Sequence, residues 1–289
     1  MNYRHAYHAG NFADVFKHSV LTRIILYLQR KEAAFRFIDT HAGTGQYSLA
    51  AEAAQKTGEW LDGIGRLQEA KLPANALALM QPYLDIALPM AMTADKNAAY
   101  PGSPLIARHL FRKQDRLTAI ELHPEDAKLL AKRFAGDYQA RIIELDGWLA
   151  LGAHLPPKEK RGLVLIDPPF EEKGEFERMI DGVVKAHKRW PGGIYALWYP
   201  MKKRADVVRY RNALAASGVP NIIDAELSVR DSGGTKLDGC GMTIINPPFT
   251  LEAELRVVLA ALAPVLEMEP RTARWGVKRL AAEADSSKI

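Results

Sequence analysis

Short apolar runs alternate with stretches of helical periodicity along this chain of 289 residues. Seven runs have the length and composition of strands, at 35–38, 117–120, 141–145, 163–166, 193–199, 222–229 and 242–245. Apolar positions near a 3.6-residue period predict helices at 13–30, 104–112, 175–189, 202–216 and 251–266, and others that begin at Tyr47 and Pro124. This alternation predicts an α/β fold with a parallel sheet.

The segment 58–98 interrupts the alternation. It has helical periodicity, divided by Pro73 and Pro82, where a second strand would be expected. We therefore predict a small helical subdomain at 58–98, inserted into a main domain formed by 1–57 and 99–266. Residues 267–289 have weak periodicity, and we expect a partly disordered tail that docks through Trp275.

Four strands of the predicted sheet end in or beside an acidic residue. These residues are Asp39, Glu121, Asp146 and Asp167. Parallel connections place such strand ends at one edge of the sheet, where open α/β folds bind their ligands. Four acids at one edge favour a ligand that carries a ribose, an adenine amine and a cationic centre.

Asp167 begins the tetrapeptide Asp-Pro-Pro-Phe, directly after the apolar run 163–166. Proline cannot continue a central strand, so the strand must end near Asp167, with Phe170 close by. The acid, the rigid carbonyls and the aromatic face suit a planar ring that bears an amine. Taken alone, the tetrapeptide is equally compatible with a strand end and a proline-rich turn. Asn246 begins a near-copy after the last strand, where we expect a strand terminator close to the cleft.

The first strand leads into Asp-Thr-His-Ala-Gly-Thr-Gly at 39–45. Glycines at a turn between strand and helix let a ligand approach the backbone closely. Position 48 is Ser, so the third glycine of the dinucleotide fingerprint is absent, which disfavours a nicotinamide-dependent oxidoreductase. The pattern alone is a weak signal for any one ligand.

Two helix starts show capping residues. Asn11 is expected to cap the helix at 13–30, and Ser103 the helix at 104–112. By pattern alone, Lys17 and His18 are ordinary surface residues of the first helix.

Composition adds few constraints. The net charge of +5 permits a polyanionic partner without requiring one. A single cysteine, Cys240, excludes an intramolecular disulfide and a cysteine-based zinc site, and it favours a cytoplasmic location. The N-terminus lacks the apolar core of a signal peptide, and no apolar run is long enough to cross a bilayer. His5 and His8 lack further ligands at suitable spacing, so we expect no metal site. Because no apolar run could cross a bilayer, we also expect no membrane partner.

Long blocks of the chain resemble the RlmJ family of class I S-adenosylmethionine-dependent methyltransferases, from Tyr3 to about Phe249. The tetrapeptide at Asp167 resembles motif IV of the amino-methyltransferases. The other similar blocks are Tyr3-Arg4-His5, His8-Ala9-Gly10-Asn11, Ala13-Asp14-Val15, Lys17-His18, 39–43, 100–108, Glu121-Leu122-His123-Pro124 and 195–200. The resemblance implies a Rossmann-like sheet of seven strands, the last antiparallel, with a small helical insertion. It also implies methylation of an adenine N6 in 23S ribosomal RNA (rRNA).

The resemblance assigns roles to individual residues. Asp167 would be catalytic, and Tyr3 would lie near the substrate entrance. The residues that would bind S-adenosylmethionine are Lys17, His18 and Ser103 at the methionine part, His41 and Gly43 beside it, Glu121 at the ribose, Asp146 and Gly147 at the adenine, and Asp167. Where this chain has Phe170 the family often has Tyr, and either ring can stack on a base.

A mechanism follows from these residue types. Asp167 and the carbonyl of Pro168 can each accept a hydrogen bond from N6, which holds this weak nucleophile in line with the methyl group. The carboxylate would stabilise positive charge developing on N6. Phe170 would stack on the base, which must be unpaired or flipped out. Arg4 and the basic segments 185–189 and 202–211 are predicted to contact phosphates, although such charge runs are usually solvated.

Other interpretations stay open. A DNA adenine-N6 or protein-glutamine methyltransferase shares the tetrapeptide, and a non-catalytic RNA-binding assembly factor could use the same scaffold. Such a factor should have lost the acid or the glycine loop, and this chain has both. The expected substrate is protein-free 23S rRNA or an early assembly intermediate.

Overall fold

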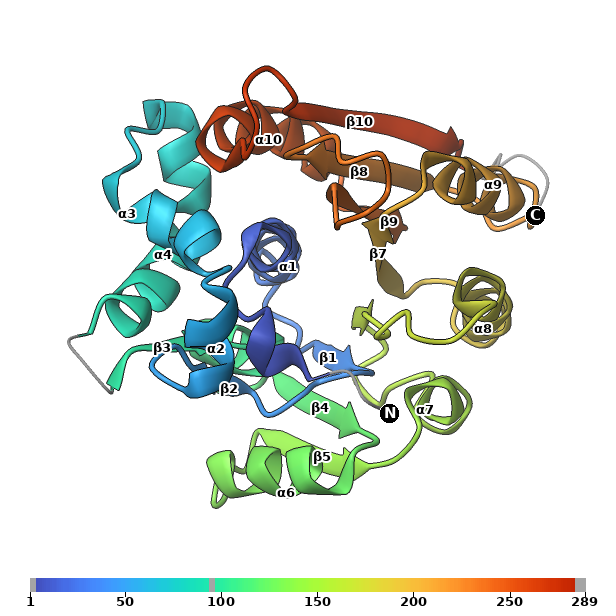
Figure 1. Cartoon of the computed structure of the whole chain (residues 1–289). Helices are drawn as coiled ribbons and strands as arrows, with labels where there is room; N and C mark the ends of the chain where they lie inside the picture. Colours follow the sequence, from blue (N-terminus) through green and yellow to red (C-terminus); the bar gives the residue numbers. More distant parts are fainter. Residues whose placement is uncertain (1–3, 94–96, 284–289) are drawn as a thin grey trace.

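The computed structural model describes residues 4–93 and 97–283, which form a three-layer α/β structure (Figure 1). The middle layer is a sheet of eight strands in the order β10-β8-β9-β7-β6-β1-β4-β5. These strands are β1 (Arg36–Asp39), β4 (Arg116–Glu121), β5 (Ala140–Glu144), β6 (Gly162–Ile166), β7 (Ile194–Met201), β8 (Ile222–Ser228), β9 (Gly239–Ile245) and β10 (Arg274–Ala281). A separate two-stranded sheet pairs β2 (Gln46–Ser48) with β3 (Ala99–Pro101).

Helices cover both faces of the large sheet (Figure 1). On one face lie α1 (Phe12–Leu28), α5 (Ser103–Leu110), α6 (Pro124–Arg133) and α10 (Leu251–Leu266), and on the other α7 (Gly147–Ala153), α8 (Glu175–Arg189) and α9 (Arg204–Ala215). Successive residues of β6 enter different cores, Leu163 and Leu165 on the α1 side and Val164 and Ile166 on the α8 side. Burial of both faces explains the continuous apolar runs.

The predicted Rossmann-like α/β class is confirmed, but the sheet has one strand more than predicted. β9 is the expected antiparallel strand, and the eighth strand, β10, comes from the tail. The expectation of disorder is therefore wrong for Arg274–Ala281, and Trp275 pairs with Leu227 of β8. Local periodicity missed β10 because it is an edge strand with a single buried residue, Val277.

Residues 58–93 are mainly helical, as predicted. They include the π-helical turn η2 (Leu61–Gly65), α3 (Arg66–Glu69) and α4 (Ala74–Ala91), with Pro82 inside α4. Their buried side chains join the same core as α1 and α10, so the division into a main domain and a subdomain stays a prediction. Other short helices are η1 (His5–Tyr7) and α2 (Glu52–Thr57).

Two local predictions near the glycine loop are wrong. Tyr47 lies in β2 rather than in a helix, because its partner strand β3 comes from beyond the insertion. Ser103 lies inside the first turn of α5, and its hydroxyl donates to Asp39 Oδ2 at 2.6 Å instead of capping the helix. The predicted Asn11 cap is confirmed, since its side chain accepts hydrogen bonds from two backbone amides of α1.

Strand direction decides which residues reach the ligand-binding edge. β1 pairs in parallel with β4 and β6, so these three strands end at one edge. β9 runs the other way, and Asn246 therefore lies at the opposite edge, where its amide donates to the carbonyls of Pro191 and Gly193. Asn246 ends a strand as predicted, but its expected place near the cleft is wrong. Among the helices of 4–93 and 97–283, none combines the length and apolar character needed to span a bilayer.

One of the predicted RNA-binding arginines is buried. The Arg211 side chain is 7% exposed and forms ion pairs with Asp224, at 2.8 Å, and with Glu226. The Tyr199 hydroxyl donates to Asp224 and accepts from Arg211, at 2.8 and 2.6 Å. Arg211 therefore holds α9 on the sheet and is not available to RNA. Its neighbour Arg209 is exposed and pairs with an acid of the same helix.

A second buried polar chain ties α1 to α4 and β3. His18 Nδ1 lies 2.8 Å from the Tyr100 hydroxyl, which lies 3.0 Å from the Tyr83 hydroxyl. All three side chains are buried, and burial lowers the pKa of His18 to about 3. The folded protein therefore holds His18 in its neutral form.

Replacing Arg211 by Met should lower the free energy of unfolding by about 3–5 kcal/mol, because it leaves the buried Asp224 unpaired. Replacing Arg209 by Met should cost less than about 1 kcal/mol, because its ion pair is exposed. Urea denaturation of both variants measures the difference. Equal losses would contradict the structural role of Arg211.

The stabilisation that comes from keeping His18 neutral should also fall as the pH falls from 7 to 5. Unfolded His18 takes up a proton with a pKa near 6.5, whereas the folded state resists protonation until about pH 3. Its contribution is complete above pH 6.5, and about 2 kcal/mol of it should be lost at pH 5. Denaturation of wild type and His18→Asn across this range tests the effect. An equally steep pH dependence in the variant would refute it.

Candidate active site

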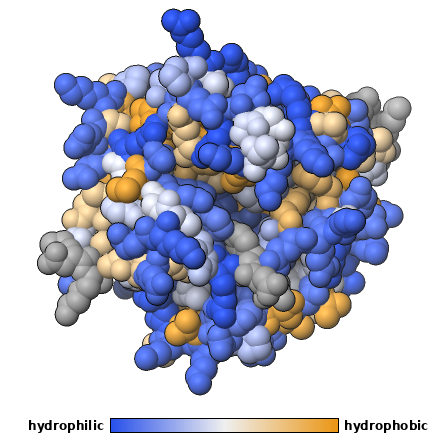
Figure 2. Space-filling model, in the orientation of Figure 1, coloured by the Kyte–Doolittle hydropathy of each residue, from blue (hydrophilic) through white to orange (hydrophobic). Residues whose placement is uncertain are grey.

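A cavity of ≈ 1040 Å³ opens at the edge where the parallel strands end. Figure 2 shows a recess near the middle of this face, among mainly hydrophilic residues. Its walls come from the start of α1, the segments that follow β1, β4, β5, β6 and β7, and the β8–β9 loop. Pockets for one drug-sized ligand span roughly 300–1,000 Å³, so this cavity can hold a ligand and part of a second molecule.

Most of the predicted site residues line this one cavity. They are Lys17, His18, His41, Gly43, Ser103, Glu121, Asp146, Gly147, Asp167, Pro168 and Phe170. Two predicted substrate contacts are not among them. Tyr3 lies outside the described residues. The Arg4 guanidinium instead pairs with Glu125 and Asp126 at the start of α6, at 3.0 and 2.9 Å.

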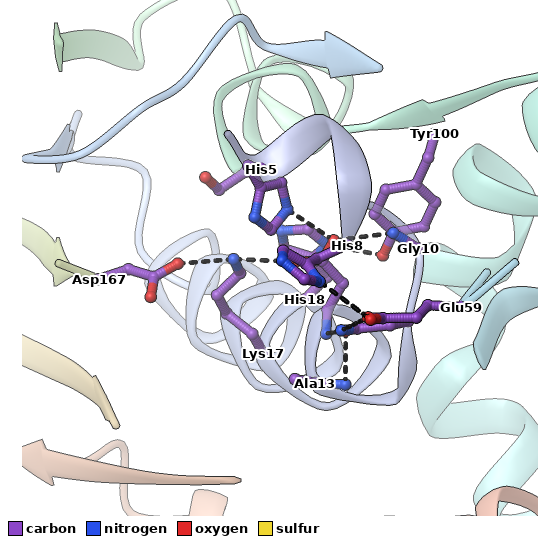
Figure 3. A network of polar contacts seen from close by, with 12 residues as sticks. His5, His8, Gly10, Ala13, Lys17, His18, Glu59, Tyr100 and Asp167 are labelled. Carbon is purple, nitrogen blue, oxygen red and sulfur yellow. Dashed lines mark hydrogen bonds and ion pairs between the residues drawn. The ribbon is translucent and has the colours of Figure 1, made fainter. Parts of the chain in front are cut away.

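An ammonium group joins α1 to the end of β6. Lys17 Nζ lies 2.6 Å from Asp167 Oδ2 and 2.9 Å from Asp14 Oδ1, and Figure 3 shows Lys17 and Asp167 pointing toward one another. Burial disfavours the charged lysine, but the two carboxylates raise the pKa of Lys17 well above its usual value. The sequence pattern alone predicted that Lys17 and His18 are surface residues. This prediction is wrong, because α1 is packed inside the structure and both side chains are buried.

Asp14 is the buried centre of this network. Its Oδ2 accepts a hydrogen bond from the Gly10 amide and lies 2.9 Å from His5 Nε2. Burial would raise the pKa of Asp14, but His5 and Lys17 hold it well below its usual range. In the sequence, Asp14 is visible only as an acid three residues after the predicted cap, Asn11. Its partners come from other parts of the fold, so the local pattern gave no signal of this role.

Glu121 shapes the glycine loop. Its two carboxylate oxygens accept hydrogen bonds from the backbone amides of Gly43 and His123, both at 2.8 Å. Gly43 has a φ of +60°, and a β-carbon there would meet the Tyr47 hydroxyl at 1.9 Å. The loop therefore requires glycine at position 43. Burial raises the pKa of Glu121, and the two amides oppose this rise.

Two further predicted acids, Asp39 and Asp146, stabilise the segments around the cavity. Asp39 is fully buried beneath the cavity, bound by the Ser103 hydroxyl, and burial raises its pKa to about 7. Asp146 caps α7 by accepting from the Trp148 amide at 2.7 Å. Gly147 follows it so closely under the glycine loop that a β-carbon would lie 2.3 Å from the Thr40 carbonyl oxygen. Three of the four predicted acids thus line the cavity.

His41 and Phe170 present rings at the cavity wall. His41 packs edge-on against Trp148 at 5.5 Å, and burial lowers its pKa to about 4, so the ring is neutral. Phe170 has a φ of +52°, which is a strained backbone for an aromatic residue. Its ring lies edge-on to Phe176 at 5.0 Å and to Trp198 at 6.1 Å. Trp148 and Trp198 also line the cavity and were missed, because isolated aromatics in apolar segments look like core residues.

The opposite wall contains residues that the sequence did not assign to the site. His8 Nδ1 lies 3.0 Å from Glu59 Oε2, which also accepts from the Asn11 side chain at 3.0 Å. Arg230 and Lys236 reach the cavity from the glycine-rich β8–β9 loop. Within the described part of the chain, no group of three or more His, Cys, Asp or Glu side chains is arranged to hold a metal ion.

Comparisons with known proteins agree with this architecture. A family model described as "Ribosomal RNA large subunit methyltransferase D, RlmJ" matches residues 32–279. The match thus extends beyond Phe249, where the resemblance was expected to end. Among solved structures, protein LPL1258 from Legionella pneumophila has a TM-score of 0.84 and 32% identity, covering 94% of this chain and 98% of that one.

Two curated relatives are similar over most of their length, and both are named Ribosomal RNA large subunit methyltransferase J. The one from Escherichia coli is 44% identical over 261 residues, which are 90% of this chain and 91% of the relative. The one from Haemophilus influenzae is 39% identical over 285 residues, 98% of this chain and 100% of the relative. The chain therefore belongs to the RlmJ family, and it is a class I methyltransferase whose methyl donor is S-adenosylmethionine.

Proposed function

We propose that this enzyme methylates the exocyclic N6 of one adenine in 23S rRNA. The observation that carries the proposal is the tetrapeptide at 167–170, which follows β6 and lines the cavity with its acid and its aromatic ring. Both curated relatives are named for the large-subunit rRNA, which supports an rRNA substrate. The proposed substrate is protein-free 23S rRNA or an early assembly intermediate in the cytoplasm.

The donor set of the cavity fits S-adenosylmethionine. Glu121 offers carboxylate oxygens to ribose hydroxyls, and Asp146 with Gly147 would hold the adenine. Lys17, His18 and Ser103 would meet the methionine part. His18 Nε2 is buried without a hydrogen-bond partner among the described residues, as expected of a group that forms its hydrogen bond with a bound ligand. When bound, the cofactor supplies an electrophilic methyl group.

Asp167 is suited to hold the reacting amine. Lys17 engages its Oδ2, whereas no hydrogen bond between described residues engages Oδ1. Oδ1 and the Pro168 carbonyl can therefore each accept one hydrogen bond from N6. This leaves the nitrogen lone pair directed at the methyl group, and such positioning supplies much of the rate of an in-line displacement.

Positive charge would develop on N6 during the proposed methyl transfer. The S-adenosylmethionine held by these residues would supply the methyl group as a sulfonium, and N6 would carry the positive charge once it accepts that group. The Asp167 carboxylate stabilises that charge where it develops. The methylated N6 is then acidic enough to release its proton readily. Phe170 would stack on the flipped base, which contributes roughly 1–3 kcal/mol of binding.

A DNA adenine or a protein glutamine is the second candidate, because the tetrapeptide serves those amines equally well. Transfer of labelled methyl groups to 23S rRNA, DNA and protein separates the three classes. Parallel reactions with protein-free rRNA and assembled subunits identify the assembly stage. A scaffold that only binds RNA is disfavoured, since Asp167 and the glycine loop are both in place.

Replacing Asp167 by Ala should lower kcat for 23S rRNA by roughly 10²–10³-fold, as for the loss of one group that stabilises transition-state charge. Phe249→Ala is the matched control, because Phe249 ends the near-copy at the opposite edge and is 92% exposed. It should keep wild-type activity. Single-turnover methylation with mapping of the modified base measures both. Full activity of Asp167→Ala would refute the proposed role.

Exposed cations beside the cavity should bind the RNA backbone. Lys202, Lys203 and Arg204 are exposed at the start of α9 and belong to none of the ion pairs found between described residues. Replacing all three by Gln should weaken RNA binding and flatten its salt dependence, because phosphate contacts release counterions. Fluorescence anisotropy with a labelled rRNA fragment at several salt concentrations measures the slope. An unchanged slope would remove this segment from the RNA interface.

A further inference from the structure

The cavity carries opposite charges at its two ends. Glu121 and Asp146 follow β4 and β5 at one end, and Lys202, Arg230 and Lys236 follow β7 and β8 at the other. In the strand order β8-β9-β7-β6-β1-β4-β5, Asp167 at the end of β6 lies between them. A ligand group at the cationic end is therefore on the opposite side of Asp167 from the proposed ribose and adenine site of the cofactor.

Strand pairing holds the cationic end in place. Met201 of β7 and Ser228 of β8 both pair with Gly239 of β9, so the segments that follow β7 and β8 leave the sheet at the same level, on either side of β9. The loop between β8 and β9 then packs back on β7. Its Gly234 has a φ of +88°, and a β-carbon there would lie 3.1 Å from the Lys202 carbonyl oxygen. The loop is thus an ordered part of the cavity wall.

Among the described residues, the Arg230 guanidinium has no oxygen partner. Its Nε is buried without a hydrogen bond there, and the hydrogen bond of a terminal nitrogen goes to the sulfur of Met268. No ion pair between residues described by the structure includes Arg230, Lys202 or Lys236. The field of Arg230 reaches Glu59, but that carboxylate is already bound by His8 and Asn11. An unpaired buried donor is costly, and an anionic ligand would remove that cost.

We propose that Arg230, flanked by Lys202 and Lys236, binds the backbone phosphate beside the target adenosine. The planar guanidinium donates two parallel hydrogen bonds, which match the oxygens of a phosphate. Base and phosphate of one nucleotide are separated by its ribose, so both fit a single cavity with the base at Asp167. This inference rests on the proposed nucleic-acid substrate. It gives Arg230 a positioning role, because phosphate contacts set register and carry no base sequence.

The experiment compares two small probes that share the base and differ in phosphate, adenosine and adenosine 3′,5′-bisphosphate. Isothermal titration calorimetry measures their binding to wild type, Arg230→Gln, Arg230→Lys and Lys236→Gln. Arg230→Gln should bind the bisphosphate about ten- to a hundred-fold more weakly, as for the loss of charged hydrogen bonds, and adenosine equally well. Arg230→Lys should recover part of the loss. Lys128→Gln, an exposed change of equal charge on α6, should behave as wild type.

Binding of an rRNA fragment gives an independent reading. The slope of log Kd against log salt should fall in Arg230→Gln by about 0.7–0.9 for each phosphate that the variant no longer neutralises. Affinity for S-adenosylmethionine should stay unchanged. Loss of cofactor affinity instead would overturn the proposal and assign Arg230 to the cofactor carboxylate.

Wild-type binding of the bisphosphate by both Arg230→Gln and Lys236→Gln would also overturn the proposal. Lys236 is exposed, so a folding defect in the Arg230 variant does not decide the outcome. The probes need no methyl transfer. If wild type methylates 23S rRNA and the variants bind the bisphosphate normally, only the proposed phosphate site is refuted. If wild type fails to methylate any 23S rRNA, the proposed function fails, and the probes still report on the phosphate site.

Discussion

The active site depends on one buried ammonium group. Lys17 lies between Asp14 of its own helix and Asp167 at the end of β6, so three groups with a net charge of −1 meet at one place, where Lys17 and Asp14 are buried. Removing Lys17 would leave two neighbouring carboxylates without their shared cation, whereas removing either aspartate would leave Lys17 paired with the other. The orientation of Asp167 is therefore tied to the position of α1. That helix is in turn fixed by apolar side chains such as Phe16 and Ile24, which are fully buried in the core.

The direction of each strand then decides at which edge of the sheet the charged residues after it lie. Parallel strands bring Glu121, Asp146 and Asp167 to one edge, and the turn from β8 into β9 brings Arg230 and Lys236 to the same edge. The reversed direction of β9 sends Asn246, with its nearly identical tetrapeptide, to the opposite edge. Topology thus places two similar tetrapeptides at opposite edges of one sheet. The strand order separates the acids Glu121 and Asp146 from the cations Arg230 and Lys236 within one cavity.

Features that depend on local pattern could be predicted from the sequence, and features that depend on distant partners could not. The acids at strand ends, the Asn11 cap and the helices at 58–93 follow from neighbouring residues. β2 and β10 pair with strands far away in the chain, and their own segments carry little periodicity. Lys17 and Arg211 lie in helices where a charge normally indicates a solvated face. The tertiary fold supplies Asp167 to Lys17, and it supplies Asp224 and Glu226 to Arg211.

The strained backbone at Phe170 indicates a preorganised site. Two prolines restrict the chain before it, and a φ of +52° is retained although it is unfavourable for a residue with a β-carbon. The contacts with Phe176 and Trp198 hold the ring in this conformation at the cavity wall. A stacking surface that is already rigid loses little conformational entropy when a base arrives. The rigid ring, the fixed carboxylate and a bound phosphate would together leave a flipped adenosine few orientations, and this restriction is what an in-line transfer to N6 requires.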